Sequence, residues 1–204
     1  GKELFAQAIH NASPRFAGPF VPISCGGFSR ETVDSILIGT EKNPGKFIQA
    51  DGGTLFLDGI SEMSQDMQSF LLRFLEDGIV TPIGSRRSVQ TDVRVISAAG
   101  SEVLQKVKDG SFRLDLYYRL NVLRIDLPPL RERQADMQEL SNYFVTLLSA
   151  GYGKNIFSVS AETVERFKAN YWPGNLRQLR NIIERSLLKA EDGHELEISD
   201  VCDD

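Results

Sequence analysis

The stretch GGTLFLDGISEM, Gly52 to Met63, contains the pattern that decides the fold. Its residues Thr54 to Leu57 are a short apolar run that predicts a buried strand, and the run ends on an acid, Asp58. Ligands of parallel sheets bind at the carboxyl ends of the strands, where a carboxylate can hold Mg²⁺ directly or through water. Asp58 is therefore either a magnesium-site acid or a residue that caps the following turn, and the stretch alone favours neither.

Three further apolar runs, each bounded by turn residues, predict strands that join this one in a sheet. They are FVPIS at 20–24, VRVISAA at 93–99 and VLRIDL at 122–127. Nearly continuous apolar strands are typical of a parallel sheet that is covered by helices on both faces. The first part of the chain is therefore predicted to fold as an α/β core.

The chain opens with GKELFAQAIH, an amphipathic helical pattern with apolar residues on one face. These residues are Leu4, Phe5, Ala8 and Ile9. Backbone N–H groups at a helix start, with a lysine beside them, can bind phosphate. The pair Gly1-Lys2 is weak evidence by itself, since no strand or glycine-rich loop precedes it, and a surface lysine is the simpler interpretation. We expect the sequence to begin inside a longer motif.

Two more helical patterns lie between the predicted strands. The first, SQDMQSFLLRFLEDG, ends at Gly78 and places its apolar residues at helical spacing, namely Met67, Phe70, Leu71, Phe74 and Leu75. The second, SEVLQKVKDG, has Ser101 as its predicted N-cap and Gly110 as its stop.

Pro128 and Pro129 end this alternation, because proline has no backbone N–H to donate to a sheet. Three helical patterns follow: QADMQELSNYFVTLLSAG, SAETVERFKANYW and NLRQLRNIIERSLLKAEDG. We therefore expect two domains, an α/β core over residues 1–131 and a helical subdomain over residues 132–204.

The composition sets limits on function. The 204 residues are 41% hydrophobic and 25% charged, with a net charge of -5, which argues against a nucleic-acid binder that uses its whole surface. Any DNA binding is expected from a segment outside this chain. Cys25 and Cys202 have no metal-ligand spacing, and no apolar run reaches membrane-spanning length, so a reduced, cytoplasmic setting is expected.

Three arginines are candidates for contact with phosphate. Arg113 and Arg119 lie six residues apart around the aromatic-rich helix of FRLDLYYRLNV, and Arg177 opens the last long helix in WPGNLRQL. Arginines near phosphates stabilise the charge that develops during phosphoryl transfer, and a neighbouring subunit often supplies one. For any single arginine, a salt bridge on the surface is the commoner case.

Together these segments resemble the AAA+ domain of bacterial enhancer-binding proteins, the activators of sigma-54 RNA polymerase. The resemblance covers nearly the whole chain, and it rests on GKELFAQAIHNASPR, GGTLFLD, LLRFLEDG, DVRVISAA, FRLDLYYRLNVLRIDLPPLRER and YWPGNLRQLRNIIERS. It implies a P-loop NTPase core with a parallel sheet and a small helical lid. Family members form ring hexamers with ATP between subunits, and some are response regulators of two-component systems. They carry a sensory domain upstream and a helix-turn-helix DNA-binding domain downstream.

The resemblance also implies roles for individual residues. The start of the first helix, Gly1, Lys2 and Glu3, matches the end of the phosphate loop, whose remainder lies upstream. Asp58 matches the magnesium-site acid. Three arginines match known positions: Arg113 and Arg119 those presented to the neighbouring subunit's nucleotide, and Arg177 the lid arginine that responds to the nucleotide.

Three departures from the family pattern indicate a degenerate motor. Gly59 stands where the family has a water-activating acid, and glycine cannot polarise or orient water. Ala99 and Gly100 stand where the family has Thr followed by Asn or His. Only Asn43 and Pro44 remain where the family has the GAFTGA loop that grips sigma-54, so a turn is expected there.

These departures lead to a hypothesis and two alternatives. The hypothesis is a regulatory AAA+ domain that binds ATP and magnesium between subunits and controls oligomerisation, with impaired hydrolysis and no direct remodelling of sigma-54. The first alternative is an active ATPase that remodels RNA polymerase, in which Glu62 or Asp51 replaces the missing acid. The second is a structural module without a ligand. Some relatives bind cyclic-di-GMP on this domain, and the sequence carries no independent sign of that.

Overall fold

The computed structural model describes residues 1–26, 34–190 and 195–198, so that Cys202 lies outside the described residues. It contains two compact units, Gly1–Ile125 and Asp126–Asp204, which are described separately below. No helix in the described ranges combines the length and the apolar character that a membrane span needs.

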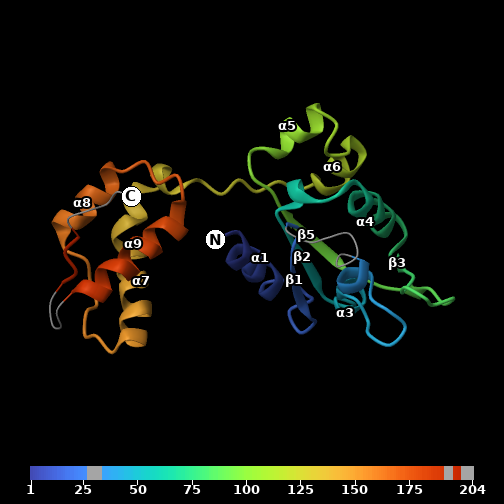
Figure 1. Cartoon of the computed structure of the whole chain (residues 1–204), viewed down its shortest axis with the longest axis horizontal. Coiled ribbons are helices and arrows are strands. Elements are labelled where there is room, and N and C mark those ends of the chain that lie inside the picture. Colours follow the sequence, from blue (N-terminus) through green and yellow to red (C-terminus); the bar gives the residue numbers. More distant parts are fainter. Residues whose placement is uncertain (27–33, 191–194, 199–204) are drawn as a thin grey trace. The chain divides into compact units, whose positions relative to one another are not determined.

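The first unit is built on a parallel sheet in the order β1-β2-β5 (Figure 1). The strands are β1 Phe20–Ser24, β2 Thr54–Asp58 and β5 Arg94–Ala98, as the apolar runs predict. The helices of the unit are α1 Lys2–Asn11, α3 Lys46–Gln49, α4 Gln65–Asp77, α5 Val103–Lys108 and α6 Leu114–Leu120. Shorter elements are the π-helix Asp34–Ile38, the 3-10 helix Ile60–Glu62 and the hairpin of β3 Ile79–Val80 with β4 Val89–Gln90.

The two faces of β2 pack against different helices, which explains why the middle of the strand, Leu55 to Leu57, is apolar on both faces. Leu55 and Leu57 point into a core that includes Leu71 and Phe74 of α4. Thr54 and Phe56 point the other way, and the hydroxyl of Thr54 forms a 2.9 Å hydrogen bond with His10 Nδ1 of α1. Successive side chains of a strand alternate between faces, so the predicted two-sided burial is confirmed.

The predicted buried face of α1 is wrong. Leu4 is 70% and Phe5 43% exposed, whereas Ala6 and His10 are buried. His10 shares a hydrogen bond with Thr54 of β2, and its ring contacts that of Phe20 at 5.4 Å between centroids. These two contacts turn this side of the helix toward the sheet. A small alanine one turn away allows the close approach.

Helix α4 agrees with its predicted ends, whereas α5 does not. Ser64 caps α4 by accepting a hydrogen bond from the N–H of Met67, and Gly78 ends it with a left-handed backbone, φ 68°. The predicted N-cap of α5, Ser101, is wrong, because the helix begins one residue later, with Glu102 at the N-cap position.

The predicted strand at 122–127 is also wrong, because this segment has no regular secondary structure. Val122 and Leu123 are 76% and 89% exposed. A strand needs a neighbour to take its backbone N–H and C=O groups, and β5, the last strand of the described sheet, pairs only with β2. The apolar pattern alone therefore did not make a strand.

In the described part of the second unit there are three α-helices, as predicted: α7 Met137–Tyr152, α8 Ala161–Ala169 and α9 Asn175–Lys189. The short 3-10 helices Leu130–Glu132 and Gln134–Asp136 precede them. Helix α7 packs against both α8 and α9. The centre of this unit is Trp172, which is fully buried, donates a 2.6 Å hydrogen bond to the carbonyl of Phe167 and meets the ring of Phe167 edge-on.

Candidate nucleotide site

The carboxyl ends of the three strands lie side by side and are tied together by their backbones. Ser24, Asp58 and Ala98 share one register position. The N–H of Cys25 donates to the carbonyl of Asp58 at 2.8 Å, and the N–H of Gly59 donates to that of Ala98 at 3.0 Å. Asp58 is exposed at this edge, so its carboxylate is open to a ligand.

Lys2 reaches the same edge from the start of α1. Its Nζ donates a 3.0 Å hydrogen bond to the carbonyl of Ala99, the residue that follows β5. The lysine, the exposed first turn of α1 with Gly1 and Glu3, and Asp58 therefore converge at the end of the sheet. A cation and helix N–H groups opposite a carboxylate suit a phosphate with its magnesium.

Asp58 is a candidate ligand for magnesium at this edge, because its carboxylate is exposed at the tip of β2. Within the described residues, no three His, Cys, Asp or Glu side chains gather as a metal site. Mg²⁺ is commonly held by one or two carboxylates together with water and substrate phosphate, so a single exposed aspartate beside a phosphate site fits this ion.

Gly59 follows Asp58 with a left-handed backbone, φ 74°, and starts the 3-10 turn Ile60–Glu62. This turn folds the chain back, so that a methyl group on Gly59 would lie 3.7 Å from a carboxylate oxygen of Glu62. The same carboxylate fills the space beside Gly26. The structure therefore brings the carboxylate of Glu62 next to Gly59.

Asp51, the other acid considered as a replacement, lies at the opposite edge of the sheet. Its carboxylate accepts a 2.7 Å hydrogen bond from the N–H of Asp92, before β5 begins. The length of β2 separates it from Asp58, roughly 15 Å at 3.3 Å per residue. Asp51 is excluded as the replacement.

Sequence reasoning missed a polar network behind Lys2. Ser61 donates a 2.6 Å hydrogen bond to Glu102 Oε1, and Lys106 donates to the carbonyl of Ser61 at 2.8 Å. The bond from Ser61, and more weakly the charge of Lys2, hold the pKa of Glu102 below its ordinary value. The absence of a side chain at Gly100 leaves room for this carboxylate. An acid therefore lies beside Gly100.

The pKa of the Cys25 thiol responds to the charged groups at this edge of the sheet. Burial, and then the carboxylates of Asp58 and Glu62, raise the pKa of its thiol to about 12. Because only the thiolate reacts, we expect alkylation of Cys25 at pH 8 to be at least about 100-fold slower than that of an unhindered cysteine peptide. Peptide-resolved mass spectrometry of a time course measures this rate separately from that of Cys202. Alkylation at the peptide's rate would contradict this environment.

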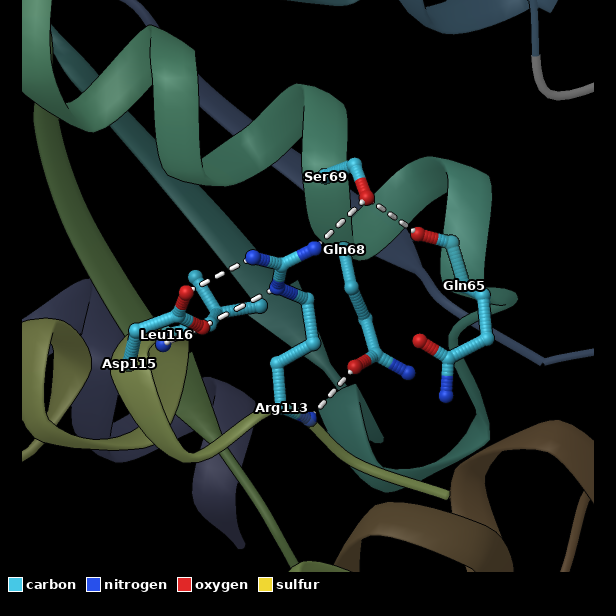
Figure 2. A network of polar contacts seen from close by, with 6 residues as sticks. All are labelled: Gln65, Gln68, Ser69, Arg113, Asp115 and Leu116. Carbon is cyan, nitrogen blue, oxygen red and sulfur yellow. Dashed lines mark hydrogen bonds and ion pairs between the residues drawn. The ribbon is translucent and has the colours of Figure 1, made fainter. Parts of the chain in front are cut away.

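Arg113 is the first of the two candidate arginines in the first unit. It is held tightly at the N-cap of α6 (Figure 2). Its Nε and Nη2 donate to the two carboxylate oxygens of Asp115 at 3.0 and 2.7 Å, and Nη1 donates to Ser69 Oγ at 3.3 Å. This pairing lowers the pKa of Asp115 to about 2. The side chain of Arg113 stays 40% exposed, so it is fixed in position but accessible to solvent.

Arg119 and Arg177 are placed differently. Arg119 Nη2 donates a 3.0 Å hydrogen bond to the carbonyl of Leu75 near the end of α4. Both arginines of α6 are therefore held by α4. Arg177 is exposed in the first turn of α9, in the second unit.

The segment at 40–43 is a tight turn, as expected. The N–H of Thr40 donates to the carbonyl of Asn43 at 2.9 Å, and Gly39 pairs with Pro44 in an isolated bridge. The turn lies beside the hairpin of β3 and β4, because the N–H of Ile83 donates to the carbonyl of Gly39 at 2.8 Å.

A parallel sheet, a lysine at the start of the first helix, an acid at the tip of a strand and a helical second unit define a P-loop nucleotide-binding domain of the AAA+ class with its lid. Residues 1–126 match the sigma-54 interaction domain, and residues 131–204 match the AAA+ ATPase lid domain. The chain belongs to the sigma-54 interaction domain family of transcription regulators.

Similar proteins include the phenol regulator MopR of Acinetobacter guillouiae, 41% identical over 97% of this chain and 37% of MopR. The DNA-binding transcriptional regulator NtrC of Rhizobium meliloti is 42% identical over 91% of this chain and 40% of NtrC. The crystal structure of NtrX from Brucella abortus in complex with ATP superposes with a TM-score of 0.90 at 34% identity, covering 98% of this chain and 48% of NtrX. The chain thus spans less than half the length of these three proteins.

Proposed function

We propose that this chain is the regulatory AAA+ domain of a transcription factor, which binds ATP and magnesium between subunits and thereby controls oligomerisation. Residues 1–131 would bind the nucleotide and residues 132–204 would serve as its lid. Hydrolysis is impaired, and the domain does not remodel sigma-54 directly. The observation that carries this proposal is Gly59, which puts no side chain beside Asp58 where water must be activated.

The retained groups support binding and assembly. Lys2 and the start of α1 would hold the phosphates, and Asp58 would hold magnesium, which neutralises part of the phosphate charge. Arg113 and Arg119 would face the nucleotide of the neighbouring subunit, and Arg177 would respond to the subunit's own nucleotide. A ligand held between subunits favours the oligomer by mass action.

The other partners follow from the family. RNA polymerase is the proposed target, and promoter DNA would be bound by a domain outside this chain. The tight turn at Thr40–Asn43 supports the absence of direct sigma-54 remodelling, because a turn closed by Gly39 and Pro44 offers no extended arm.

The test is ATP binding and turnover by the full-length protein, with cyclic-di-GMP as a second ligand. We expect ATP to bind and to promote oligomers, without turnover above the level of an Asp58→Asn variant. Turnover well above that level would contradict the impaired motor. If no nucleotide binds, the remaining interpretation is a structural module without a ligand. If cyclic-di-GMP binds selectively, it is the ligand in place of ATP.

A second candidate, an active ATPase, is favoured by the position of Glu62, whose carboxylate lies beside Gly59. In that case Glu62 would orient the attacking water in place of the missing acid. Glu62→Gln distinguishes the two functions. It abolishes turnover if Glu62 is the base, and it leaves an already inactive protein unchanged if our proposal is correct.

We expect Gly59→Glu to raise ATP turnover at least about 10-fold, since a general base contributes about 10²- to 10⁴-fold. The gain is reduced because a left-handed backbone costs a residue with a side chain about 1–2 kcal/mol, and because the new carboxylate meets that of Glu62. Steady-state phosphate release measures the effect.

The matched control is Gly84→Glu, which adds the same charge at a similar positive φ, 78°, where an added Cβ meets no atom within 4 Å. It should leave turnover unchanged. If Gly59→Glu also has no effect, the missing polar groups at Ala99 and Gly100 or the subunit interface also limit hydrolysis.

A further inference from the structure

Gln68 is a fully buried polar side chain that no role assigned so far explains. It lies in the first turns of α4, with none of its surface exposed. Its Nε2 donates to the carbonyls of Met63 at 2.9 Å and Ser111 at 3.0 Å, and its Oε1 accepts the N–H of Arg113 at 2.8 Å. One amide thus joins two segments that are far apart in the sequence.

The first of these segments is the turn that starts at Asp58. The N–H of Glu62 donates to the carbonyl of Gly59, and the N–H of Met63 donates to that of Ile60. These bonds make a compact turn that begins at Gly59, the residue after Asp58, and ends at Met63, whose carbonyl accepts a hydrogen bond from Gln68. A movement of Asp58 toward a ligand therefore reaches Gln68 through one closed turn.

The second segment carries the arginine that faces the neighbouring subunit. Gln68 holds the backbone of Arg113, and Ser69, the next residue of α4, contacts its guanidinium (Figure 2). Asp115 fixes the remaining nitrogens of that group. The position of Arg113 is thus set by the same turn of α4 that contacts the loop after Asp58.

A buried amide that loses a partner is costly, because no water replaces the lost hydrogen bond. The loop and the arginine segment therefore cannot separate from Gln68 independently at low cost. Two segments linked through one buried amide, which uses both of its N–H groups and its oxygen, are expected to move together, and coupling between two sites requires such a link.

We propose that Gln68 is a positioning residue that couples the loop after Asp58 to Arg113. The nucleotide state of one subunit would thereby set the arginine that this subunit presents to the next. This inference rests on the proposed binding of ATP between subunits.

The experiment uses the full-length protein and three variants, Gln68→Met, Arg113→Ala and the double variant. Methionine keeps the length of the side chain and removes its hydrogen bonds. We expect Gln68→Met to raise the concentration needed for ATP-dependent assembly about 10-fold, while ATP affinity of dilute subunits stays within about twofold. The double variant should be no worse than Arg113→Ala, because both changes act through one arginine.

Gln65→Met is the matched control. Gln65 lies on the same helix and also donates to the carbonyl of Ser111, at 2.8 Å, but it is exposed and has no bond to Met63 or Arg113. Assembly by this variant should equal that of the wild type.

Gln68→Glu provides a second test of the lost hydrogen bonds, and it serves if Gln68→Met does not fold. Burial raises the pKa of an introduced carboxyl, and its protonated form can again donate one hydrogen bond and accept another. Assembly by Gln68→Glu relative to wild type should therefore recover as the pH falls from 8 to 6.

The outcomes separate the inference from the proposed function. Wild-type protein that does not assemble with ATP would overturn both. With normal wild-type assembly, the inference alone is overturned by unchanged assembly of Gln68→Met, by additive effects in the double variant, or by a Gln68→Glu variant that does not respond to pH.

Discussion

Replacement of Lys2 by alanine should weaken ATP binding by the full-length protein about 30-fold or more, since a charged hydrogen bond to phosphate is lost. Lys2 Nζ lies at the carboxyl edge of the sheet and now donates to the carbonyl of Ala99, a single bond that it can exchange for a phosphate. The fold should be unaffected, because the side chain is exposed. Isothermal titration calorimetry at fixed magnesium measures the change in Kd.

The control is Lys42→Ala, which removes an equally exposed lysine from the turn at 40–43. This variant shows how much the loss of one positive charge by itself changes ATP binding, and we expect it to change the Kd for ATP less than twofold. Equal weakening by both variants would show that Lys2 acts only through overall charge, and the candidate site would then be wrong.

Replacement of Trp172 by alanine should lower the free energy of unfolding of the helical unit by about 3–5 kcal/mol. The indole is completely buried between α8 and α9, and its Nε1 hydrogen bond to Phe167 is lost together with the ring contact at 5.3 Å. Trp172 also precedes the start of α9, so Arg177 depends on it for its position. Urea denaturation followed by circular dichroism measures the loss, which is large for a unit of this size.

Tyr171→Ala is the neighbouring control. Tyr171 is 66% exposed, and its ring contacts the guanidinium of Arg131 at 5.1 Å. Loss of such an exposed cation–π contact should cost about 1 kcal/mol or less. A small effect at Trp172 would mean that the unit can repack around a cavity in its centre.

The sequence predicted those parts of the fold whose cause is local. The alternation of apolar runs with helical patterns was sufficient to predict strands β1, β2 and β5. Helix periodicity and capping residues were sufficient to predict α4. The same reasoning failed at 122–127, because a strand also requires a neighbouring strand. It failed at α1 as well, where His10 is buried through a hydrogen bond to Thr54 that no periodicity reveals.

The residues of the candidate site also fall into those that the sequence predicts and those that it does not. Lys2 and Asp58 could be found from motif position, since a helix start and a strand end have known places in a parallel sheet. The roles of the side chains around them could not be predicted from motif position. Asp51 and Glu62 are both near Asp58 in the sequence, but the direction of β2 puts the first at the far edge and a 3-10 turn returns the second to Gly59.

The sequence by itself determined that this protein is an AAA+ domain of the sigma-54 regulator family, and it identified the residue types at each motif position. Only the tertiary structure decided which side chains meet: Glu102 with Ser61, and Gln68 with the segment of Arg113, 45 residues away. The physical reason is that hydrogen bonds of buried polar groups are set by the packing of distant segments. Local pattern carries no information about those partners.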